Sequence, residues 1–262
     1  MVGGVKDLYK ELKEMIDKSR RIVFFGGAGV STESGVPDFR SENGLYNAMK
    51  TYNHSPEEML SYSFFRSHTD TFFDYYKNSL IYADVKPNNA HLALAELEKQ
   101  GRLSAVITQN IDGLHQMAGS NRVLELHGSV MRNYCMDCGE LYDLSYIMDE
   151  KNCRDEKGQT TKIPRCERCG GIVRPDVVLY EEALDHNVIS DAVDAISGAD
   201  TLIVGGTSLV VYPAAGLVNY FRGDNLVLIN KSKTQYDGKA DLVINDPIGT
   251  VLGACVLAEH AG

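Results

Sequence analysis

Short apolar runs alternate with amphipathic stretches along most of the chain. The apolar runs, rich in Val, Ile and Leu, lie at residues 22–25, 103–108, 123–126, 177–180, 201–204, 226–230 and 241–244. Continuous runs of this length are typical of strands buried on both faces, as in a parallel sheet. Helices are predicted over 5–18, 88–100, 187–197, 213–221 and 247–258. The alternation predicts an α/β fold with an open parallel sheet and right-handed crossovers.

Two long stretches interrupt this alternation. Residues 52–82 contain five Tyr and four Phe, although the whole chain has only 14 Tyr and 8 Phe. Residues 129–174 contain five of the six cysteines and much polar sequence. We interpret 41–86 as a helical module and 129–174 as a cysteine-rich module that together build a smaller domain. The larger domain is then discontinuous and consists of residues 1–40, 87–128 and 175–262.

Composition and charge exclude some classes of protein for this chain. The 262 residues are 44% hydrophobic and 24% charged, which is ordinary globular composition and excludes a mainly disordered chain. The formal net charge is −10. A nucleic-acid-binding protein needs a basic face to neutralise phosphates, so direct nucleic-acid binding is not expected. An acidic protein is compatible with basic, lysine-containing peptide partners.

The chain shows no targeting or membrane signal. Residues 1–21 are heavily charged and contain no apolar core of a secretory signal. The longest uncharged stretch, residues 201–221, contains glycines and a proline and is better explained as a strand, a turn and a helix than as a membrane span. We therefore expect a cytoplasmic protein with no membrane association. Because the cytoplasm is reducing, we do not expect the cysteines to form structural disulfides.

Two glycine-rich turns follow predicted strands. They read Gly26-Gly27-Ala28-Gly29 and Gly205-Gly206-Thr207-Ser208. Glycines allow the backbone to approach a phosphate closely, and two such turns at the carboxyl ends of strands favour a dinucleotide. The dinucleotide fingerprint is incomplete, because Thr32 stands where a third glycine is expected and no acidic residue is evident at the usual distance. A plain strand-closing turn is the alternative.

Four cysteines form two Cys-x-x-Cys pairs. Cys135 and Cys138 are separated from Cys166 and Cys169 by 27 residues. Two such pairs match a closed, tetrahedral and structural zinc site, which has no open position to activate water. Cys153 is the alternative ligand, and two redox pairs are the alternative to zinc.

Polar residues follow two of the predicted strands. Gln109, Asn110 and Asp112 come directly after the run 103–108, and His127 follows the run 123–126. The carboxyl ends of parallel strands form the crevice of an α/β sheet, which places these side chains at a candidate active site. The alternatives are an Asx turn formed by Asp112 and a purely structural histidine.

Taken together, these motifs resemble the sirtuins, the NAD-dependent protein lysine deacylases. The resemblance runs from about residue 21 to about residue 250 and looks bacterial in type. It rests on motifs in the family's order: Gly27-Ala28-Gly29-Val30-Ser31, Ser34-Gly35-Val36-Pro37-Asp38-Phe39-Arg40, Gln109-Asn110-Ile111-Asp112-Gly113-Leu114-His115, His127-Gly128, the two cysteine pairs and Gly206-Thr207-Ser208-Leu209.

The resemblance implies a Rossmann-like NAD-binding domain with a smaller inserted zinc-binding and helical domain. It implies a monomeric enzyme that uses NAD as co-substrate and one structural Zn²⁺. Such an enzyme transfers the acyl group of acetyl-lysine in a protein or peptide to ADP-ribose and releases nicotinamide. It is an acyl-transferring deacetylase and not an oxidoreductase.

The resemblance also implies roles for individual residues. His127 is the expected general base, and Asn110 is the second catalytic residue. The expected NAD contacts are Gly27, Ala28, Gly29, Thr32, Asp38, Phe39, Arg40, Gln109, Ile111, Asp112, Gly206, Thr207, Ser208 and Asn230. The expected peptide-binding strand consists of Val177, Val178, Leu179 and Tyr180, and the aromatic-rich segment 52–82 is expected to wall off the acyl-lysine.

The sequence departs from the family's pattern at two places. Tyr180-Glu181-Glu182 stands where many members have Phe-Gly-Glu. Phe73 and Tyr76 stand where members that prefer succinyl or malonyl groups carry Tyr and Arg, so a preference for neutral acyl groups is expected. Three alternatives to a deacetylase remain: an NAD(P)-dependent dehydrogenase, a zinc-ribbon interaction module without catalysis, and a mono-ADP-ribosyltransferase.

Overall fold

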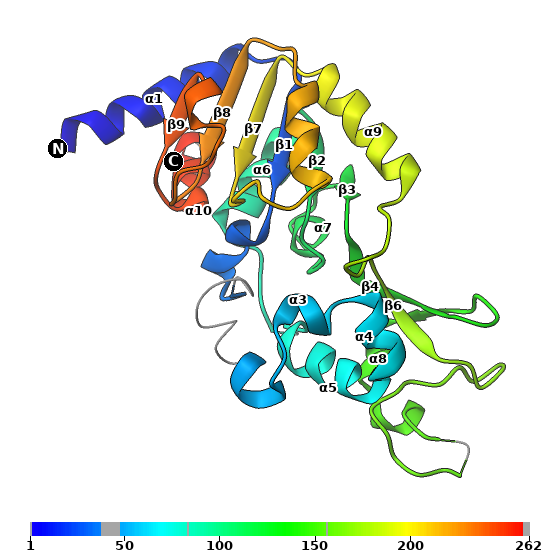
Figure 1. Ribbon diagram of the computed structural model, residues 1–262. Helices are drawn as coiled ribbons and strands as arrows, with labels where there is room; N and C mark the ends of the chain where they lie inside the picture. Colours follow the sequence, from blue (N-terminus) through cyan, green and yellow to red (C-terminus); the bar gives the residue numbers. More distant parts are fainter. Residues whose placement is uncertain (1, 38–47, 83, 156, 259–262) are drawn as a thin grey trace.

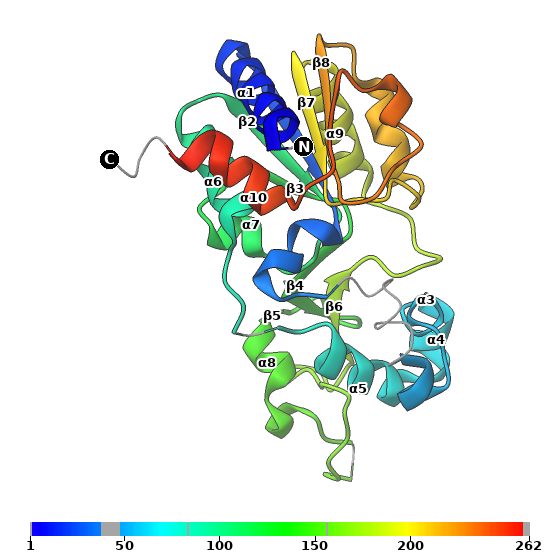
Figure 2. The same cartoon turned by 90° about the vertical axis from the view of Figure 1, so that its left-hand side faces the viewer.

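The larger lobe of the molecule is built on a six-stranded parallel sheet (Figures 1 and 2). The computed structural model describes residues 2–37, 48–82, 84–155 and 157–258. The strand order is β3-β2-β1-β7-β8-β9. The strands are β1 (Ile22–Gly26), β2 (Leu103–Thr108), β3 (Val123–Glu125), β7 (Thr201–Gly205), β8 (Asn225–Ile229) and β9 (Leu242–Ile244). This arrangement confirms the predicted α/β class.

Helices cover both faces of this sheet. One face carries α1 (Val2–Lys18), α6 (Asn89–Lys99), α10 (Ile248–Leu252) and the short π-helix η6 (Gly253–Leu257), and the other carries α9 (His186–Ser197) and the 3₁₀ helix η4 (Ala214–Tyr220). In β1, Ile22 and Phe24 enter the first core and Val23 and Phe25 the second. Side chains alternate between the faces of a strand, so β1 must be apolar throughout.

Helix α6 shows how local sequence sets an element's ends. The Asn88 side chain accepts a hydrogen bond from the Ala90 N–H at 2.8 Å, and His91 Nδ1 accepts one from the Asn88 N–H at 3.2 Å. These bonds satisfy N–H groups that a helix start otherwise leaves unpaired. Gly101, with φ +73°, follows the end of the helix. The predicted helix over 88–100 is confirmed to within one residue at each end.

The smaller lobe combines an antiparallel sheet with short helices. The sheet order is β5-β4-β6, with β4 (Gly128–Cys135), β5 (Leu141–Asp143) and β6 (Val173–Val177). The helices are α3 (Pro56–Met59), α4 (Tyr62–Ser67), α5 (Thr69–Ser79) and α8 (Leu144–Met148). Phe65 and Phe72 from the helical module share one core with Val130 and Val173 from the cysteine-rich module. The two insertions therefore pack as one body.

The remaining elements connect the lobes or close turns. They are α7 (Leu114–Met117) and the 3₁₀ turns η1 (Ala28–Val30), η2 (Thr32–Ser34), η3 (Glu150–Asn152) and η5 (Asp237–Lys239). Within the described ranges, no helix combines the length and apolar character needed to cross a bilayer.

One predicted strand is wrong. The apolar run 177–180 does not join the parallel sheet: Val177 ends β6 of the small antiparallel sheet, and Tyr180 pairs only in an isolated bridge with Ser61. The run is apolar because Val177 and Leu179 are buried in the small-lobe core, not because both faces of a strand are covered. The domain boundary expected between residues 174 and 175 falls inside β6.

Candidate active site and metal centre

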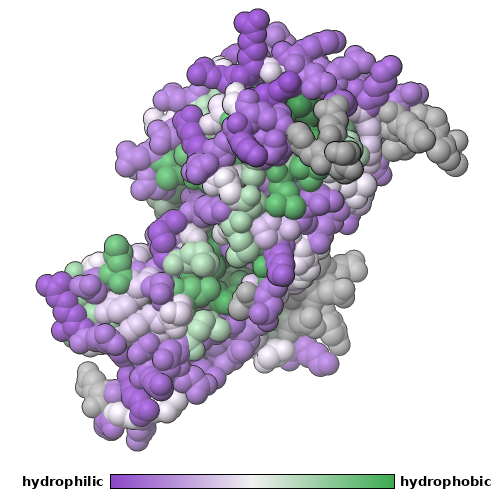
Figure 3. All heavy atoms as spheres, turned by 180° about the vertical axis from the view of Figure 1, so that it is seen from behind, coloured by the Kyte–Doolittle hydropathy of each residue, from purple (hydrophilic) through white to green (hydrophobic). Residues whose placement is uncertain are grey.

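A cavity of about 280 Å³ lies where the carboxyl ends of β1, β2 and β7 face the smaller lobe. Hydrophobic surface gathers at this junction of the two lobes (Figure 3). Most residues proposed for the site contribute to the cavity wall. They are Gly27, Ala28, Gln109, Asn110, Ile111, Asp112, His127, Val177, Val178, Leu179, Tyr180, Gly206, Thr207 and Ser208. The structure thus brings together segments that are up to about 180 residues apart in the sequence.

The two glycine turns contact each other directly. The Gly29 N–H donates to the Gly206 carbonyl oxygen at 2.8 Å. A Cβ atom on Gly29 would lie 2.7 Å from Gly206 Cα, and one on Gly27 would lie 2.9 Å from Thr207 Cβ. Gly206 itself has φ +60°. The close approach of the turns therefore requires glycine at these positions, independently of any bound phosphate.

Beyond the second turn lies a polar chain that suits a nucleotide. Gln109 Nε2 donates to Thr207 Oγ1 at 3.0 Å, and the Thr207 N–H donates to Asn230 Oδ1 at 2.9 Å. Within the described residues, the buried Asn230 Nδ2 has no hydrogen-bond acceptor. A buried donor without a partner is costly, so this atom fits a polar ligand such as a ribose hydroxyl.

Not every expected NAD contact reaches the cavity. Gly29, Thr32 and Asn230 are not part of its wall. Thr32 Oγ1 donates to the Gly29 carbonyl at 2.9 Å and so closes the first turn. Asp38, Phe39 and Arg40, also expected to contact NAD, lie outside the described residues.

Asp112 is the centre of a partly buried hydrogen-bond network at the cavity wall. Ser31 Oγ donates to Asp112 Oδ2 at 2.6 Å, and Asn110 Nδ2 donates to Ser31 Oγ at 3.1 Å. The Leu114 N–H donates to Asp112 Oδ1 at 3.0 Å, so the alternative Asx turn is also present. Burial raises the pKa of Asp112 above its ordinary value, and the bonds from Ser31 and Leu114 oppose this shift. Ser31 was not assigned from the sequence, although it ends the first glycine motif.

His127 lies between β3 and β4, at the junction of the two lobes. Its Nδ1 lies 3.0 Å from the Gln109 carbonyl oxygen. A carbonyl oxygen can only accept, so Nδ1 carries the proton and Nε2 is the basic nitrogen of the neutral ring. The orientation is the one a general base requires.

The segment that follows β6 is fixed by an ion pair that sequence reasoning missed. The buried Arg174 donates to both carboxylate oxygens of Glu182, at 2.8 and 2.9 Å, and to the Val177 carbonyl at 3.0 Å. Glu182 also accepts from the Leu179 N–H at 2.8 Å. Burial alone would raise the pKa of Glu182, but the bonds from Arg174 and Leu179 hold it below its ordinary value. The sequence signal was two charged residues flanking an apolar run.

The aromatic-rich segment contributes to both the cavity and the small-lobe core. From residues 52–82, only Leu60, Ser79, Leu80 and Tyr82 belong to the cavity wall in the described structure. Phe73 and most other rings are buried in the small-lobe core, where they join the two insertions. The role of this segment in walling off the acyl-lysine stays a prediction, and these four residues are the ones that could serve it.

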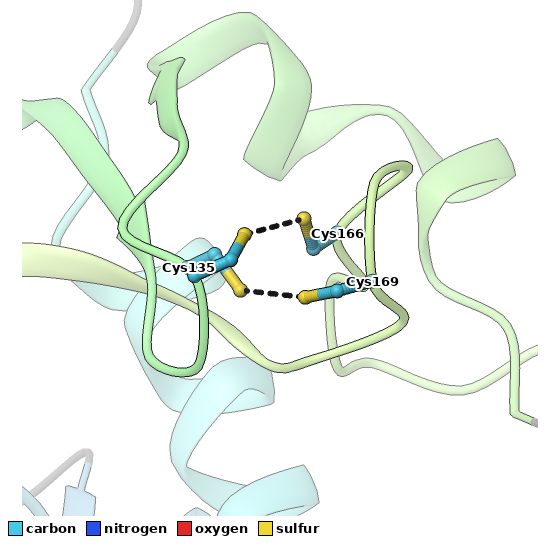
Figure 4. Close-up of side chains that lie close together, drawn as sticks. Cys135, Cys166 and Cys169 are labelled. Carbon is cyan, nitrogen blue, oxygen red and sulfur yellow. Dashed lines mark hydrogen bonds between the residues drawn. The ribbon is translucent and has the colours of Figure 1, made fainter.

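The four paired cysteines meet at one point of the smaller lobe. Their Sγ atoms lie within 4.8 Å of one another, with Cys135 3.4 Å from Cys169 and Cys138 3.6 Å from Cys166 (Figure 4). A tetrahedron of thiolates with Zn–S bonds of about 2.3 Å has S–S edges of about 3.8 Å, so the group fits one Zn²⁺.

The surroundings of the cysteine cluster agree with this fit. A Cβ atom on Gly171 would lie 2.9 Å from Cys135 Sγ, so glycine leaves the space that the cluster occupies. Cys153, the alternative ligand, is not in the cluster and accepts a hydrogen bond from Lys77 Nζ at 3.1 Å.

The fold and the site define a two-lobed dinucleotide-binding protein with a structural zinc centre. The model of the Sir2 family matches residues 27–213. An NAD-dependent protein deacetylase of Clostridium perfringens is 62% identical over 251 residues, covering 95% of this chain and 99% of the relative. One of Clostridium acetobutylicum is 61% identical over 246 residues, covering 94% and 97%. The chain belongs to the Sir2 family, and the sirtuin resemblance is confirmed.

Solved structures agree with this assignment. A Sir2 structure with a deacetylated p53 peptide and 3′-O-acetyl ADP-ribose is 38% identical, with a TM-score of 0.82, and the match covers 95% of this chain and 97% of that one. A Sir2 structure with a p53 peptide and NAD⁺ is 35% identical, with a TM-score of 0.81 and coverage of 97% and 99%.

Proposed function

We propose that this chain is an NAD-dependent protein deacetylase that transfers the acetyl group of acetyl-lysine to ADP-ribose and releases nicotinamide. The observation that carries the proposal is the convergence of both glycine turns, His127 and the 177–180 segment on one cavity between the lobes. The Sir2 relatives named as deacetylases, and the relatives solved with acetyl ADP-ribose and deacetylated peptide, support it. The residues that hold NAD then belong to the large domain predicted as 1–40, 87–128 and 175–262, apart from residues 175–177, which lie in β6 of the small sheet.

Binding of NAD falls to the turns at the sheet edge. The main chain of Gly27 and Ala28, which lies in the cavity wall, would contact the pyrophosphate, and Gln109, Thr207, Ser208 and Asn230 would hold ribose and phosphate oxygens. The Gln109–Thr207–Asn230 chain already fixes these side chains relative to one another. When bound, NAD supplies the ribose carbon that accepts the acyl oxygen as nicotinamide leaves.

Asn110, Ile111 and Asp112 would form the nicotinamide subsite. Asp112 is held through Ser31 and the Leu114 N–H, so its carboxylate is oriented before any ligand arrives. An oriented acceptor can recognise a carboxamide N–H₂ group with little loss of side-chain entropy. Asn110, tied to the same Ser31 hydroxyl, would position the neighbouring reactive group.

His127 would act as the general base. Its Nδ1 proton is held by the Gln109 carbonyl, so Nε2 would receive the proton that leaves a ribose hydroxyl.

The substrate peptide would lie along the segment Val177–Tyr180 in the cavity wall and pair with the main chain of Glu181, whose N–H and carbonyl groups form no hydrogen bond with another described residue. Main-chain pairing gives affinity with little demand on peptide sequence. Arg174 and Glu182 hold this segment in place through bonds to the Val177 carbonyl and the Leu179 N–H. The described small-lobe residues of the cavity wall include no cationic side chain, so we expect neutral acyl groups to be preferred over succinyl or malonyl groups.

The test is an incubation of the protein with NAD and an acetyl-lysine peptide. We expect free nicotinamide and a peptide that has lost one acetyl group, both measured by mass spectrometry. A dehydrogenase would instead produce the absorbance of reduced nicotinamide. An ADP-ribosyltransferase would add mass to a protein, and either result would contradict the proposal.

A further inference from the structure

Glu181 has a backbone conformation that side chains rarely adopt. Its φ is +76°, in the left-handed region, where a residue with a Cβ atom is strained. Such strain persists only where surrounding contacts hold it. The Glu181 carboxylate makes these contacts, because Oε2 accepts from the Ser63 N–H at 2.9 Å and Oε1 accepts from Ser63 Oγ at 2.9 Å. The side chain is therefore fixed against the start of α4.

Among the described residues, this carboxylate has no counter-charge. The adjacent Glu182 is neutralised by Arg174, whose Nη1 lies 2.8 Å from Glu182 Oε1. No basic side chain in the described ranges lies within ion-pair distance of Glu181, and its only side-chain bonds are those to the neutral Ser63. Glu181 is exposed and forms part of the cavity wall. The Glu181 carboxylate is therefore a fixed negative charge in the cavity wall, and no described basic side chain neutralises it.

The main chain at Glu181 is open to a peptide. The N–H of the preceding Tyr180 donates to the Leu60 carbonyl at 2.9 Å, and the Tyr180 carbonyl accepts from the Tyr62 N–H at 3.0 Å. The N–H and carbonyl groups of Glu181 form no hydrogen bond with any other described residue. Because most main-chain groups of 177–180 are already bonded within the chain, a peptide in the cavity would pair at Glu181, which brings a residue beside the modified lysine close to the carboxylate.

We propose that Glu181 is a specificity-determining residue that selects acyl-lysine peptides with a basic side chain next to the modified lysine. This inference rests on the proposed function. A neighbouring Lys or Arg supplies the missing counter-charge, whereas a neighbouring Asp or Glu is repelled. Because the pair is exposed to solvent, the preference is modest and falls as salt screens it.

The test compares two acetyl-lysine peptides that differ only in having Lys or Glu beside the acetyl-lysine. We expect the wild-type kcat/KM to favour the Lys peptide by about three- to tenfold at low salt. Glu181→Gln removes the charge and Glu181→Gly also relieves the strained φ, so both should reduce this ratio by about threefold or more. A ratio between two peptides is unaffected by loss of folded protein. Glu11→Gln, on the exposed side of α1, is the matched control.

Each result decides between stated alternatives. A ratio that falls in both Glu181 variants, stays unchanged in Glu11→Gln and shrinks for the wild type between about 50 and about 500 mM salt supports the inference. An equal ratio in wild type and Glu181→Gln overturns it while leaving the deacetylase function intact. If the wild-type protein deacetylates neither peptide, the proposed function is wrong and the inference falls with it.

Discussion

Arg174 and Glu182 form a buried, two-point ion pair whose remaining hydrogen bonds go to the backbone of the segment between them. Arg174 donates to the Val177 carbonyl and Glu182 accepts from the Leu179 N–H. The guanidinium carbon of Arg174 lies 5.3 Å from the ring centroid of Phe65 and 5.8 Å from that of Tyr134. The pair thus fixes the main chain of the proposed peptide-binding segment, and Glu182 is itself part of the cavity wall.

Removing one partner of this ion pair should lower the free energy of unfolding more than removing both partners. Arg174→Met leaves a partly buried carboxylate without its cation and should lower the free energy of unfolding by about 3–5 kcal/mol. The double variant Arg174→Met/Glu182→Leu should be more stable than the single variant, as measured by urea unfolding. Both should raise the KM for the peptide more than the KM for NAD. Equal changes in the two KM values would contradict the positioning role.

His127→Ala should lower the deacetylation rate by about 100-fold or more, because it removes the proposed base. The variant should keep its zinc and its melting temperature, and it should retain some exchange of labelled nicotinamide into NAD, which does not need the base. His186→Ala, at the exposed start of α9, is the control. A His127→Ala protein with wild-type deacetylation would exclude His127 as the base.

Removal of the metal should unfold the smaller lobe. Cys169→Ser, or a strong zinc chelator, should lower the free energy of unfolding by about 4 kcal/mol or more, because the cysteine-rich module has little apolar core of its own. Metal analysis should find one zinc per chain in the wild type and in Cys255→Ala, whose sulfur lies in the other lobe. Full stability after chelation would disprove the structural role of zinc.

Two buried histidines should make the larger lobe sensitive to acid. Burial lowers the pKa of His91 to about 4, and burial together with His91 lowers that of His115 to about 3. The unfolded chain takes up these protons near pH 6.5, so it binds more protons than the folded state as the pH falls below that value. The free energy of unfolding therefore has its full value above about pH 6.5. It decreases as the pH falls toward 4, by about 1.4 kcal/mol per pH unit for each ring.

Urea unfolding between about pH 7 and about pH 4.5 measures this slope. His115→Phe should have a shallower slope than the wild type, whatever its absolute stability, and His186→Ala should have an unchanged one. An identical slope in His115→Phe would show that this ring does not provide the proton linkage.

The sequence predicted features that depend on local pattern. Apolar runs located the parallel strands, and the spacing of the paired cysteines located the metal ligands. Both features depend on residues that are close together in the sequence, so they can be recognised without knowledge of the tertiary structure. The Arg174–Glu182 pair and the His91–His115 contact were not predicted, since each depends on how distant segments pack. The run 177–180 was assigned to the wrong sheet for the same reason: burial in the small-lobe core produces the same apolar pattern as a central strand.

The shared core of the smaller lobe has a consequence for synthesis of the chain on the ribosome. Helices α4 and α5 are completed long before β4 and β6 are translated, so their aromatic faces have no partner when they first emerge. The nascent helices must wait, exposed to solvent or to chaperones, until the strands arrive. Slow translation between residues 80 and 130 would prolong that exposure.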